Sequence, residues 1–300
     1  MCVVCHLFTN LKWFSQNLDI VDMTSSNHLD IKYQWDPSRD GDSAILTPTA
    51  SVRIKRDLLE IFKDPPPGIY VVGDESDIRY VHAIIVGVMD TPYEGGFFYF
   101  LLKCPADYPI LPPKVKFMTT DAGRVRFNPN LYKNGKVCLS ILGTWTGPAW
   151  SPAQQISTVL LSIQSLMNEK PYYNEPGYDR ERTPGDAKRY NEYLRHETLR
   201  VAVCGMLENE CHLSIPPQLV EMMESTFLQF FDLYTETCRD NLRSDGEFYI
   251  DPFGGNTGCN FEYTKILERL ETIRSNLQKK QNIPVSLPFT DGEGSDEKDV

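Results

Sequence analysis

The sequence lacks an excess of positive charge, since 30 Lys and Arg residues stand against 41 Asp and Glu residues and the formal net charge is −11 at pH 7. We therefore expect no nucleic-acid partner, because phosphate binding needs clustered Lys and Arg. The sequence also lacks an apolar run of the roughly 20 residues that a membrane span requires, so we expect no membrane partner. The N-terminus has no charged start followed by a long apolar stretch, as a signal peptide has. These absences favour a cytoplasmic and nuclear protein.

Metal ligands and cofactor motifs are also scarce. The eight cysteines do not imply disulfides in a chain of this length in a reducing compartment. Cys204, Cys211 and His212 could bind zinc, but no fourth ligand is evident, and core or loop cysteines are the better interpretation. The segment Cys2–His6 matches a c-type haem attachment motif, which we interpret as a chance match because no exported context is visible. We expect no metal and no cofactor.

The distribution of apolar and turn residues predicts an organisation in four parts. Residues 1–48 contain turn and breaker signals and are expected to be a flexible segment. Residues 49–207 form a folded core, and residues 208–280 form a helical extension beyond Pro216-Pro217. The acidic, glycine-containing residues 281–300 are expected to be disordered.

Periodicity within the core predicts both helices and strands. Apolar residues at helical spacing predict a first helix over about Ala50–Phe62, with Leu59 and Phe62 on its apolar side. Four strands separated by Gly and Pro turns follow. Ser151-Pro152 should open the next helix, with serine as the cap and proline in the first turn. The predicted strands are Ile69–Val72, Tyr80–Met89, Phe97–Lys103 and Lys114–Met118, and a further helix spans about Asp186–Leu207.

The extension contains an apolar stripe that is too wide to be left in water. Its members are Leu219, Met223, Phe227, Phe230 and Tyr234. We expect the stripe to pack on the core, on the last helix (about Phe261–Lys280), or on a partner.

The segment Arg126–Leu142 carries most of the functional information. An Asn-Pro-Asn turn is followed by an Asn-Gly loop, then by Cys138 at the start of an apolar stretch, and Trp-Ser-Pro comes shortly afterwards. A lone cysteine before apolar residues is ordinarily a small core residue. Here the order helix, four strands, proline-rich loop, Asn-Pro-Asn, cysteine, Trp-Ser-Pro and helix resembles the core of the ubiquitin-conjugating enzymes.

This resemblance implies an α+β fold and an acyl-transfer enzyme. The thiol of Cys138 would accept ubiquitin or a ubiquitin-like modifier from an activating enzyme as a thioester and pass it to a lysine amine. Such chemistry needs an accessible thiol. Asn130 stands where the asparagine of the family stands. It could donate its amide to the oxyanion of the intermediate or only tie the backbone of the turn, and the two roles are compatible.

The chain departs from the family in the residues around the cysteine. The family usually has histidine where this sequence has Asn128, which with Pro129 should support the loop by backbone hydrogen bonds. The acidic or serine residue that gates the lysine in the family could be Asn174 or Glu175, and the alignment does not choose between them. These departures, together with similarity in the extension, resemble one subfamily that is charged by a specialised activating enzyme and is linked to control of apoptosis.

Two further sets of residues match contact surfaces of the family. Arg53, Lys55 and Arg56 form a solvated helix face in the plain interpretation and an activating-enzyme contact by resemblance. Ile110, Pro152 and Ala153 stand where the ligase-contacting loops lie, or they are ordinary loop residues. Two alternatives to an active conjugating enzyme are an inactive ubiquitin-binding module of the same fold and a thiol hydrolase. Cys138 with Asn130 argues against the first, and the absence of a histidine near Cys138 in sequence argues against the second.

Overall fold

The computed structural model describes residues 34–39, 45–253 and 258–281. The segment Cys2–His6 and the acidic tail lie outside the described residues. From Trp35 onward the described chain forms one compact unit.

The first long helix, α2 (Pro48–Lys63), confirms the predicted helix. Thr47 is its cap and accepts a hydrogen bond from the Ala50 amide at 3.1 Å, and Pro48 occupies the first turn, where its missing N–H costs nothing. The expectation that Leu59 and Phe62 are buried is wrong, since they are 50% and 84% exposed. The buried positions, spaced by four, three and four residues, are Ala50, Ile54, Asp57 and Ile61.

The four predicted strands form one antiparallel sheet in the order β1-β2-β3-β4. Nearly every residue of β2 and β3 is buried, because the sheet is covered on both faces, and this explains why their sequences are continuous apolar runs. β2 ends three residues earlier than predicted, and Val88 and Met89 are exposed beyond it. The strands are β1 (Ile69–Gly73), β2 (Tyr80–Val86), β3 (Phe97–Lys103) and β4 (Lys114–Phe117).

The helix that follows the segment Arg126–Leu142 begins later than predicted. α3 spans Ile156–Leu166, and Gln155 and Thr158 cap it reciprocally. Ser151 instead bonds within its own turn, where its amide donates to Gln154 Oε1 at 2.9 Å. Local side-chain bonds of this kind hold the backbone out of a helix, so the prediction of a helix opening at Ser151-Pro152 is wrong.

The helix predicted over about Asp186–Leu207 is continuous but not uniform. It consists of α4 (Asp186–Glu197), a π-helical segment (Thr198–Gly205) and α5 (Met206–Glu208). Short 3₁₀ segments occur elsewhere in the described chain, at Pro37–Arg39, Ser140–Leu142, Pro171–Asn174 and Leu242–Ser244.

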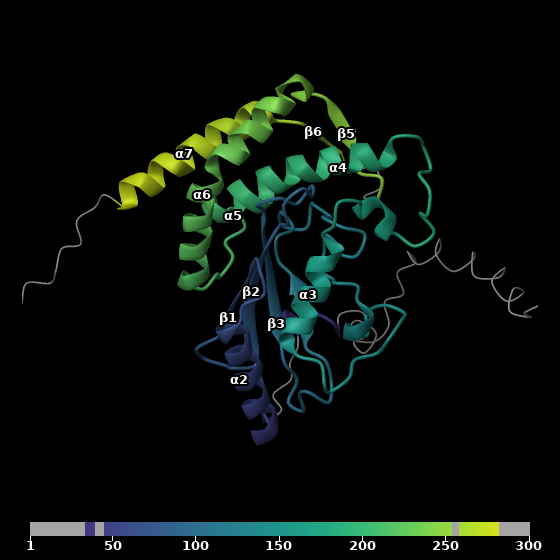
Figure 1. The fold of residues 1–300 in the computed structure, drawn as a ribbon, viewed down its shortest axis with the longest axis vertical. Helices are drawn as coiled ribbons and strands as arrows, with labels where there is room; N and C mark the ends of the chain where they lie inside the picture. The colour runs from purple at the N-terminus through teal and green to yellow at the C-terminus, as the bar shows by residue number, and fades with distance from the viewer. Residues whose placement is uncertain (1–33, 40–44, 254–257, 282–300) are drawn as a thin grey trace, which may run out of the picture. The chain divides into compact units, whose positions relative to one another are not determined.

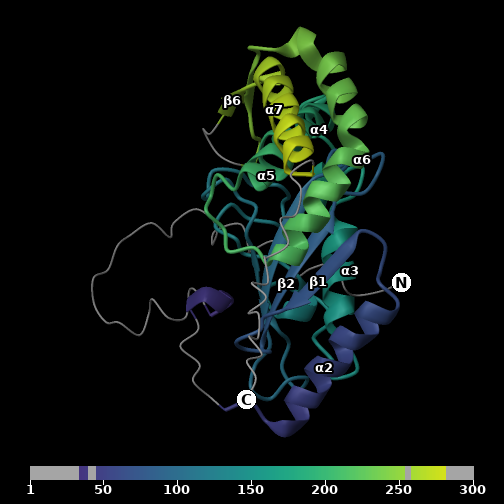
Figure 2. The same cartoon turned by 90° about the vertical axis from the view of Figure 1, so that its left-hand side faces the viewer.

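The extension consists of two long helices and a small hairpin. α6 (Pro217–Asn241) and α7 (Tyr263–Gln281) run side by side, as Figure 1 and Figure 2 show. The first half of α6 reaches β1, on the opposite side of the sheet from α3 (Figure 2). Sequence reasoning missed the hairpin of β5 (Phe248–Ile250) and β6 (Gly258–Asn260), because three-residue strands carry too little periodicity to be recognised.

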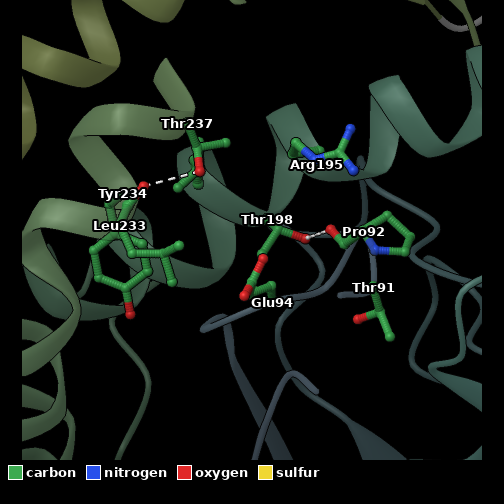
Figure 3. Close-up of a pocket in the computed structure, with 9 residues that line it drawn as sticks. Thr91, Pro92, Glu94, Arg195, Thr198, Leu233, Tyr234 and Thr237 are labelled. Atoms are coloured by element: carbon green, nitrogen blue, oxygen red, sulfur yellow. Dashed lines mark hydrogen bonds between the residues drawn. The ribbon is translucent and has the colours of Figure 1, made fainter. Parts of the chain in front are cut away.

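The apolar stripe of α6 is buried within the molecule. Met223, Phe227 and Tyr234 are each at most 1% exposed. Tyr234 also donates a buried hydrogen bond of 2.8 Å to the Gly95 carbonyl, in the turn between β2 and β3. Figure 3 shows this junction, which encloses a cavity of about 10 Å³ and where Thr198 Oγ1 donates to the Pro92 carbonyl at 3.0 Å. The extension is therefore joined to the core by buried contacts.

Among the residues that the structure describes, no helix is long and apolar enough to cross a lipid bilayer.

Candidate active site

The segment Arg126–Leu142 folds back on itself beside β4. Isolated bridges pair Asn128 with Leu131 and Leu131 with Val137. They bring the turn that follows Phe127 against the stretch that leads into Cys138, and the Cys138 amide donates to the Asn130 carbonyl at 2.9 Å. The eight-residue spacing between Asn130 and Cys138 is thus converted into direct contact.

The thiol of Cys138 is buried, and the residue is 2% exposed. This differs from the accessible thiol that the chemistry led us to expect. Thr144, which follows in the chain, holds the backbone on both sides of the cysteine. Its Oγ1 donates to the Val137 carbonyl at 2.6 Å and accepts from the Leu139 amide at 3.0 Å. Sequence reasoning did not single out Thr144.

The charges and donors around the thiol act in opposite directions on its acidity. Burial is the largest influence and raises the pKa of Cys138 above its usual value. The positive charges of Lys136 and Arg126 and a hydrogen bond with Tyr132 lower that pKa, while the negative charge of Glu175 raises it. The thiolate form therefore has stabilising neighbours despite its burial.

Asn130 is engaged with the backbone of the cysteine. Its Nδ2 donates to the Cys138 carbonyl at 3.0 Å, which is the turn-holding role. The contact also brings the amide donor of Asn130 next to Cys138.

Asn128, which is buried, and Asn174, which is partly exposed, belong to one amide network. Asn128 Nδ2 donates to Tyr93 Oη at 2.9 Å and to the Leu166 carbonyl at 2.8 Å. Its Oδ1 accepts from the Asn130 amide at 3.0 Å, and Asn174 Nδ2 donates to the same Leu166 carbonyl at 2.9 Å. The network holds the turn with the side chain of Asn128 as well as with backbone bonds.

Glu175 and Asn174 differ in what their side chains do. Asn174 is occupied by the amide network, whereas Glu175 carries a charge that acts on Cys138. Arg126 joins the two sides of the site, because its Nη2 contacts Glu175 Oε2 at 3.2 Å and the Pro129 carbonyl at 2.5 Å. The electrostatics thus favour Glu175 as the acidic residue of the site.

The residues of the first helix do not all face solvent. Arg53 is 14% exposed in its side chain and bonds to Asp57, so the interpretation of Arg53 as a solvated residue is wrong. Its guanidinium also donates to the Pro152 and Gln154 carbonyls, at 2.9 and 2.6 Å. Arg53 thereby ties α2 to the loop that precedes α3.

The other predicted contact residues are exposed at that end of the molecule. Lys55, Arg56, Pro152 and Ala153 are exposed, and Ile110 is 64% exposed. A groove of about 510 Å³ runs between α2 and Pro109 and is lined by Arg53 and Arg56. The structure therefore brings Arg53 and Arg56 of the helix beside Pro109, and Arg53 beside Pro152.

His82 and His196 have hydrogen-bond partners other than Cys138. His82 Nδ1 lies 2.6 Å from Tyr99 Oη, and His196 Nδ1 lies 2.8 Å from Glu197 Oε1. No group of three or more His, Cys, Asp or Glu side chains in the described ranges is arranged to hold a metal ion.

Comparison with known proteins identifies the class to which this arrangement belongs. The family described as ubiquitin-conjugating enzyme matches residues 53–197, the part of the chain that contains the sheet, the Asn-Pro-Asn turn and Cys138. The chain belongs to the ubiquitin-conjugating enzyme family. Members of this family form a cysteine thioester with ubiquitin and transfer it, so the chain is a transferase of protein ubiquitination.

Relatives extend the similarity through the extension. The chain is 55% identical over 248 residues to the Xenopus tropicalis protein called ubiquitin-conjugating enzyme E2 Z. The matched residues make up 82% of this chain and 78% of that protein. The chain is 56% identical to the Homo sapiens protein of the same name, over 82% of this chain and 69% of that protein. A probable ubiquitin-conjugating enzyme protein 17 of Caenorhabditis elegans is 44% identical over 50% of this chain and 22% of its own length.

Proposed function

We propose that Cys138 is the thiol that receives ubiquitin from the activating enzyme as a thioester and passes it to a lysine amine of a substrate, with or without a ligase. The supporting observation is the contrast between Cys138 and the other buried cysteines. Desolvation raises the pKa of Cys238 to about 12 and raises the pKa values of Cys104 and Cys204 strongly. One positive charge lowers the pKa of Cys204 and one that of Cys238, whereas the pKa of Cys138 is lowered by two positive charges, Lys136 and Arg126, and by a hydrogen bond with Tyr132.

The chemistry is an exchange of acyl partners. The Cys138 thiolate attacks the thioester carbonyl on the activating enzyme, the new S–C bond forms, and the thiol of the activating enzyme leaves. A lysine amine then attacks the thioester on Cys138, the C–N bond forms, and the C–S bond breaks with its electron pair returning to Cys138 Sγ. The amine proton passes to a nearby base.

We propose that two side chains, Asn130 and Glu175, assist the second step. Asn130 Nδ2, 3.0 Å from the Cys138 carbonyl, can turn its donor to the oxyanion of the tetrahedral intermediate. Glu175 is the candidate acceptor of the amine proton, because its carboxylate is the acidic group that acts on Cys138. The Asn128–Asn174 network and Pro129 hold the turn that carries Asn130.

The choice of modifier and the cellular role belong to the proposal as well. Ubiquitin is the modifier that the names of the relatives support. A second, ubiquitin-like modifier, a specialised activating enzyme, a link to apoptosis, and a cytoplasmic and nuclear location stay predictions from the sequence. Offering ubiquitin and the second modifier separately, each with ATP and its activating enzyme, distinguishes these possibilities.

A charging assay tests the central step. Wild-type protein incubated with activating enzyme, ATP and ubiquitin should form an adduct that reducing thiol removes. Cys138→Ser should form at most a slower adduct that resists thiol and yields to hydroxide, because serine gives an ester. If Cys138→Ser still formed a thiol-sensitive adduct at the wild-type rate, another cysteine would carry the modifier.

The inactive-module and hydrolase alternatives make other predictions. An inactive module would bind ubiquitin without forming any thiol-sensitive adduct. A hydrolase would release free ubiquitin from a thioester in the absence of any amine. The environment of Cys138 favours neither, since a hydrolase needs a base paired with the thiol, and His82 and His196 bond to Tyr99 and Glu197 instead.

A further inference from the structure

We infer that the C-terminal extension completes the active site: through Phe253 it holds Arg126 beside Cys138, and Arg126 is a positioning residue for the transfer of the modifier to an amine. This inference rests on the proposed function of Cys138. It concerns residues from two distant parts of the chain, 127 positions apart, that meet at one guanidinium.

Arg126 joins the turn of the active site to the extension. Its Nε donates to the Asn128 carbonyl at 3.3 Å and its Nη2 to the Pro129 carbonyl at 2.5 Å. Its Nη1 donates to the Phe253 carbonyl at 3.2 Å. The side chain is 16% exposed, and its planar fork of five N–H donors suits several acceptors in fixed directions. A shift of the Phe253 carbonyl would therefore move the group that holds the turn before Asn130.

The same guanidinium also faces the reacting groups. Its Nη2 lies 3.2 Å from Glu175 Oε2, and its Cζ lies 4.4 Å from the centre of the Tyr132 ring. Both Tyr132 and the Arg126 charge lower the pKa of the Cys138 thiol. Arg126 thus contacts the proposed proton acceptor, Glu175, and lies over the ring of Tyr132.

On the side of the extension, Phe253 is fixed in two ways. Its amide donates to Asp251 Oδ1 at 2.9 Å, which closes a tight turn after β5. Its ring lies over the Arg126 guanidinium at 5.5 Å and packs against three tyrosines of the core. Those tyrosines are Tyr172, Tyr178 and Tyr190, with ring centroids 5.6, 5.3 and 4.9 Å away.

A role in transfer follows from what Arg126 holds. In the second step the lysine nitrogen forms the C–N bond, the C–S bond breaks, its electron pair returns to Cys138 Sγ, and the amine proton passes to the Glu175 carboxylate. Arg126 fixes the direction of this carboxylate and of the turn that presents Asn130. Misplacement of such groups by about 1 Å costs about 100-fold in rate, so loosening one anchor of Arg126 should slow transfer by about tenfold.

Single-turnover discharge tests this inference on the full chain. Each variant is first charged with ubiquitin, ATP is then removed, and loss of the thioester is followed at increasing concentrations of free lysine. Phe253→Ala and Arg126→Lys should each lower the saturating rate about tenfold, with little change in the lysine concentration that gives half of it. The double variant should be no slower than Arg126→Lys alone, because both changes interrupt one connection.

Tyr249→Ala is the matched control. Tyr249 is a buried aromatic of the same hairpin that packs on Tyr193 and Phe261 rather than on Arg126. Its discharge rate should stay within about twofold of wild type, and combined with Arg126→Lys its effect should be additive within that margin. If Phe253→Ala does not fold, Phe253→Leu replaces it in the same discharge comparison, because leucine keeps much of the side-chain volume but lacks the aromatic ring.

Two results would overturn the inference. One is an equal loss of discharge in Tyr249→Ala and Phe253→Ala, which would mean that the extension acts only by general stability. The other is full additivity of Phe253→Ala with Arg126→Lys. Failure of the proposed function is separate, because it would appear earlier, as a wild-type protein whose adduct does not depend on Cys138.

Discussion

At the scale of single residues, the acidity of the Cys138 thiol is a balance between burial and charge. Burial raises its pKa, and Lys136 is the largest of the influences that lower it. Since the thiolate is the nucleophile, the rate of thioester formation should depend on this balance. Burial thus disfavours the thiolate form of Cys138, and the neighbouring positive charges partly offset this effect.

The pH dependence of charging follows from that balance. Because burial raises the pKa of the Cys138 thiol above its usual value, the thiolate fraction, and with it the charging rate, should rise as the pH is raised from 7 to 9. Lys136→Gln removes a positive charge, raises the pKa further, and should slow charging about two- to fivefold at a fixed pH, the range expected for a partly exposed charge. Lys133→Gln is the control, since Lys133 acts on Asp251 instead. Equal rates for Lys136→Gln and wild type at pH 7.5 would contradict this account.

The two roles of Asn130 can be separated by kinetics. If its amide stabilises the oxyanion, Asn130→Ala should leave charging nearly intact and slow discharge to lysine by about 100- to 1,000-fold. If it only bonds to the Cys138 carbonyl, as at 3.0 Å in the structure, the melting temperature should fall while discharge persists. Unchanged discharge to free lysine would exclude the catalytic role.

Sequence reasoning found the residues whose partners are close in the chain. Asn130 and Cys138 meet through a short bridge of paired backbone, so their spacing carried the information. The contact between Arg126 and Phe253 spans 127 positions, and no local pattern predicts it. Burial of the thiol was missed as well, because no local pattern predicts that Cys138 is only 2% exposed.

At the scale of elements, the strands and long helices could be predicted because their buried positions give a regular pattern of apolar residues in the sequence. β2 and β3 are buried on both faces and are continuous apolar runs, while α2 has apolar positions at helical spacing. The prediction failed where a side chain competes with the backbone, as at Ser151, whose turn delays α3 to Ile156. It also failed for the short hairpin of the extension.

The turn after β5 should make stability depend on pH through Asp251. Burial is the main cause that raises the pKa of Asp251 from 3.8 to about 6. The folded protein thus holds this proton where the unfolded chain has released it. The resulting stability is fully present below pH 3.8 and is lost as the pH rises through about 6, a change of about 3 kcal/mol at about 1.4 kcal/mol per pH unit.

Asp251→Asn tests this dependence while keeping an acceptor for the Phe253 amide. Urea unfolding at pH 4.5 and at pH 8 should show that wild type loses about 2 kcal/mol relative to the variant between these values, because the unfolded chain has already released part of its proton at pH 4.5. A constant difference between the two proteins across this range would mean that Asp251 is ionised in the folded state at both.

At the scale of the whole molecule, core and extension depend on each other. Arg200 of the π-helical segment bonds to Asp121 at 2.8 Å and to Glu197 at 2.5 Å. His196 accepts from the Glu262 amide at 3.0 Å. With the Tyr234–Gly95 bond, these contacts link the sheet, the helix after α3 and the extension into one folded unit.

Truncation tests this dependence. A protein of residues 49–215 should melt on the order of 10 °C lower than the full chain, because several kcal/mol of buried contacts are lost and each is worth about 2–4 °C at this size. It should also discharge more slowly, since Arg126 loses the Phe253 carbonyl. Removal of only the tail from Asp291 is the control and should leave charging unchanged. Equal melting and charging of the truncated and full proteins would mean that the extension is not part of the catalytic fold.

The most direct test of the central claim is to ask which thiol the modifier occupies. The charged protein, still holding ubiquitin, is denatured without reducing agent, and all its free cysteines are alkylated with a first label. Thiol then releases the ubiquitin, and the cysteine so exposed takes a second, isotopically distinct label. Mass spectrometry of the peptides identifies the cysteine that carries the second label. The account predicts that the second label appears on Cys138, and that Cys138→Ala forms no thiol-sensitive adduct. A second label on any other cysteine, or a full-strength adduct on Cys138→Ala, would contradict it.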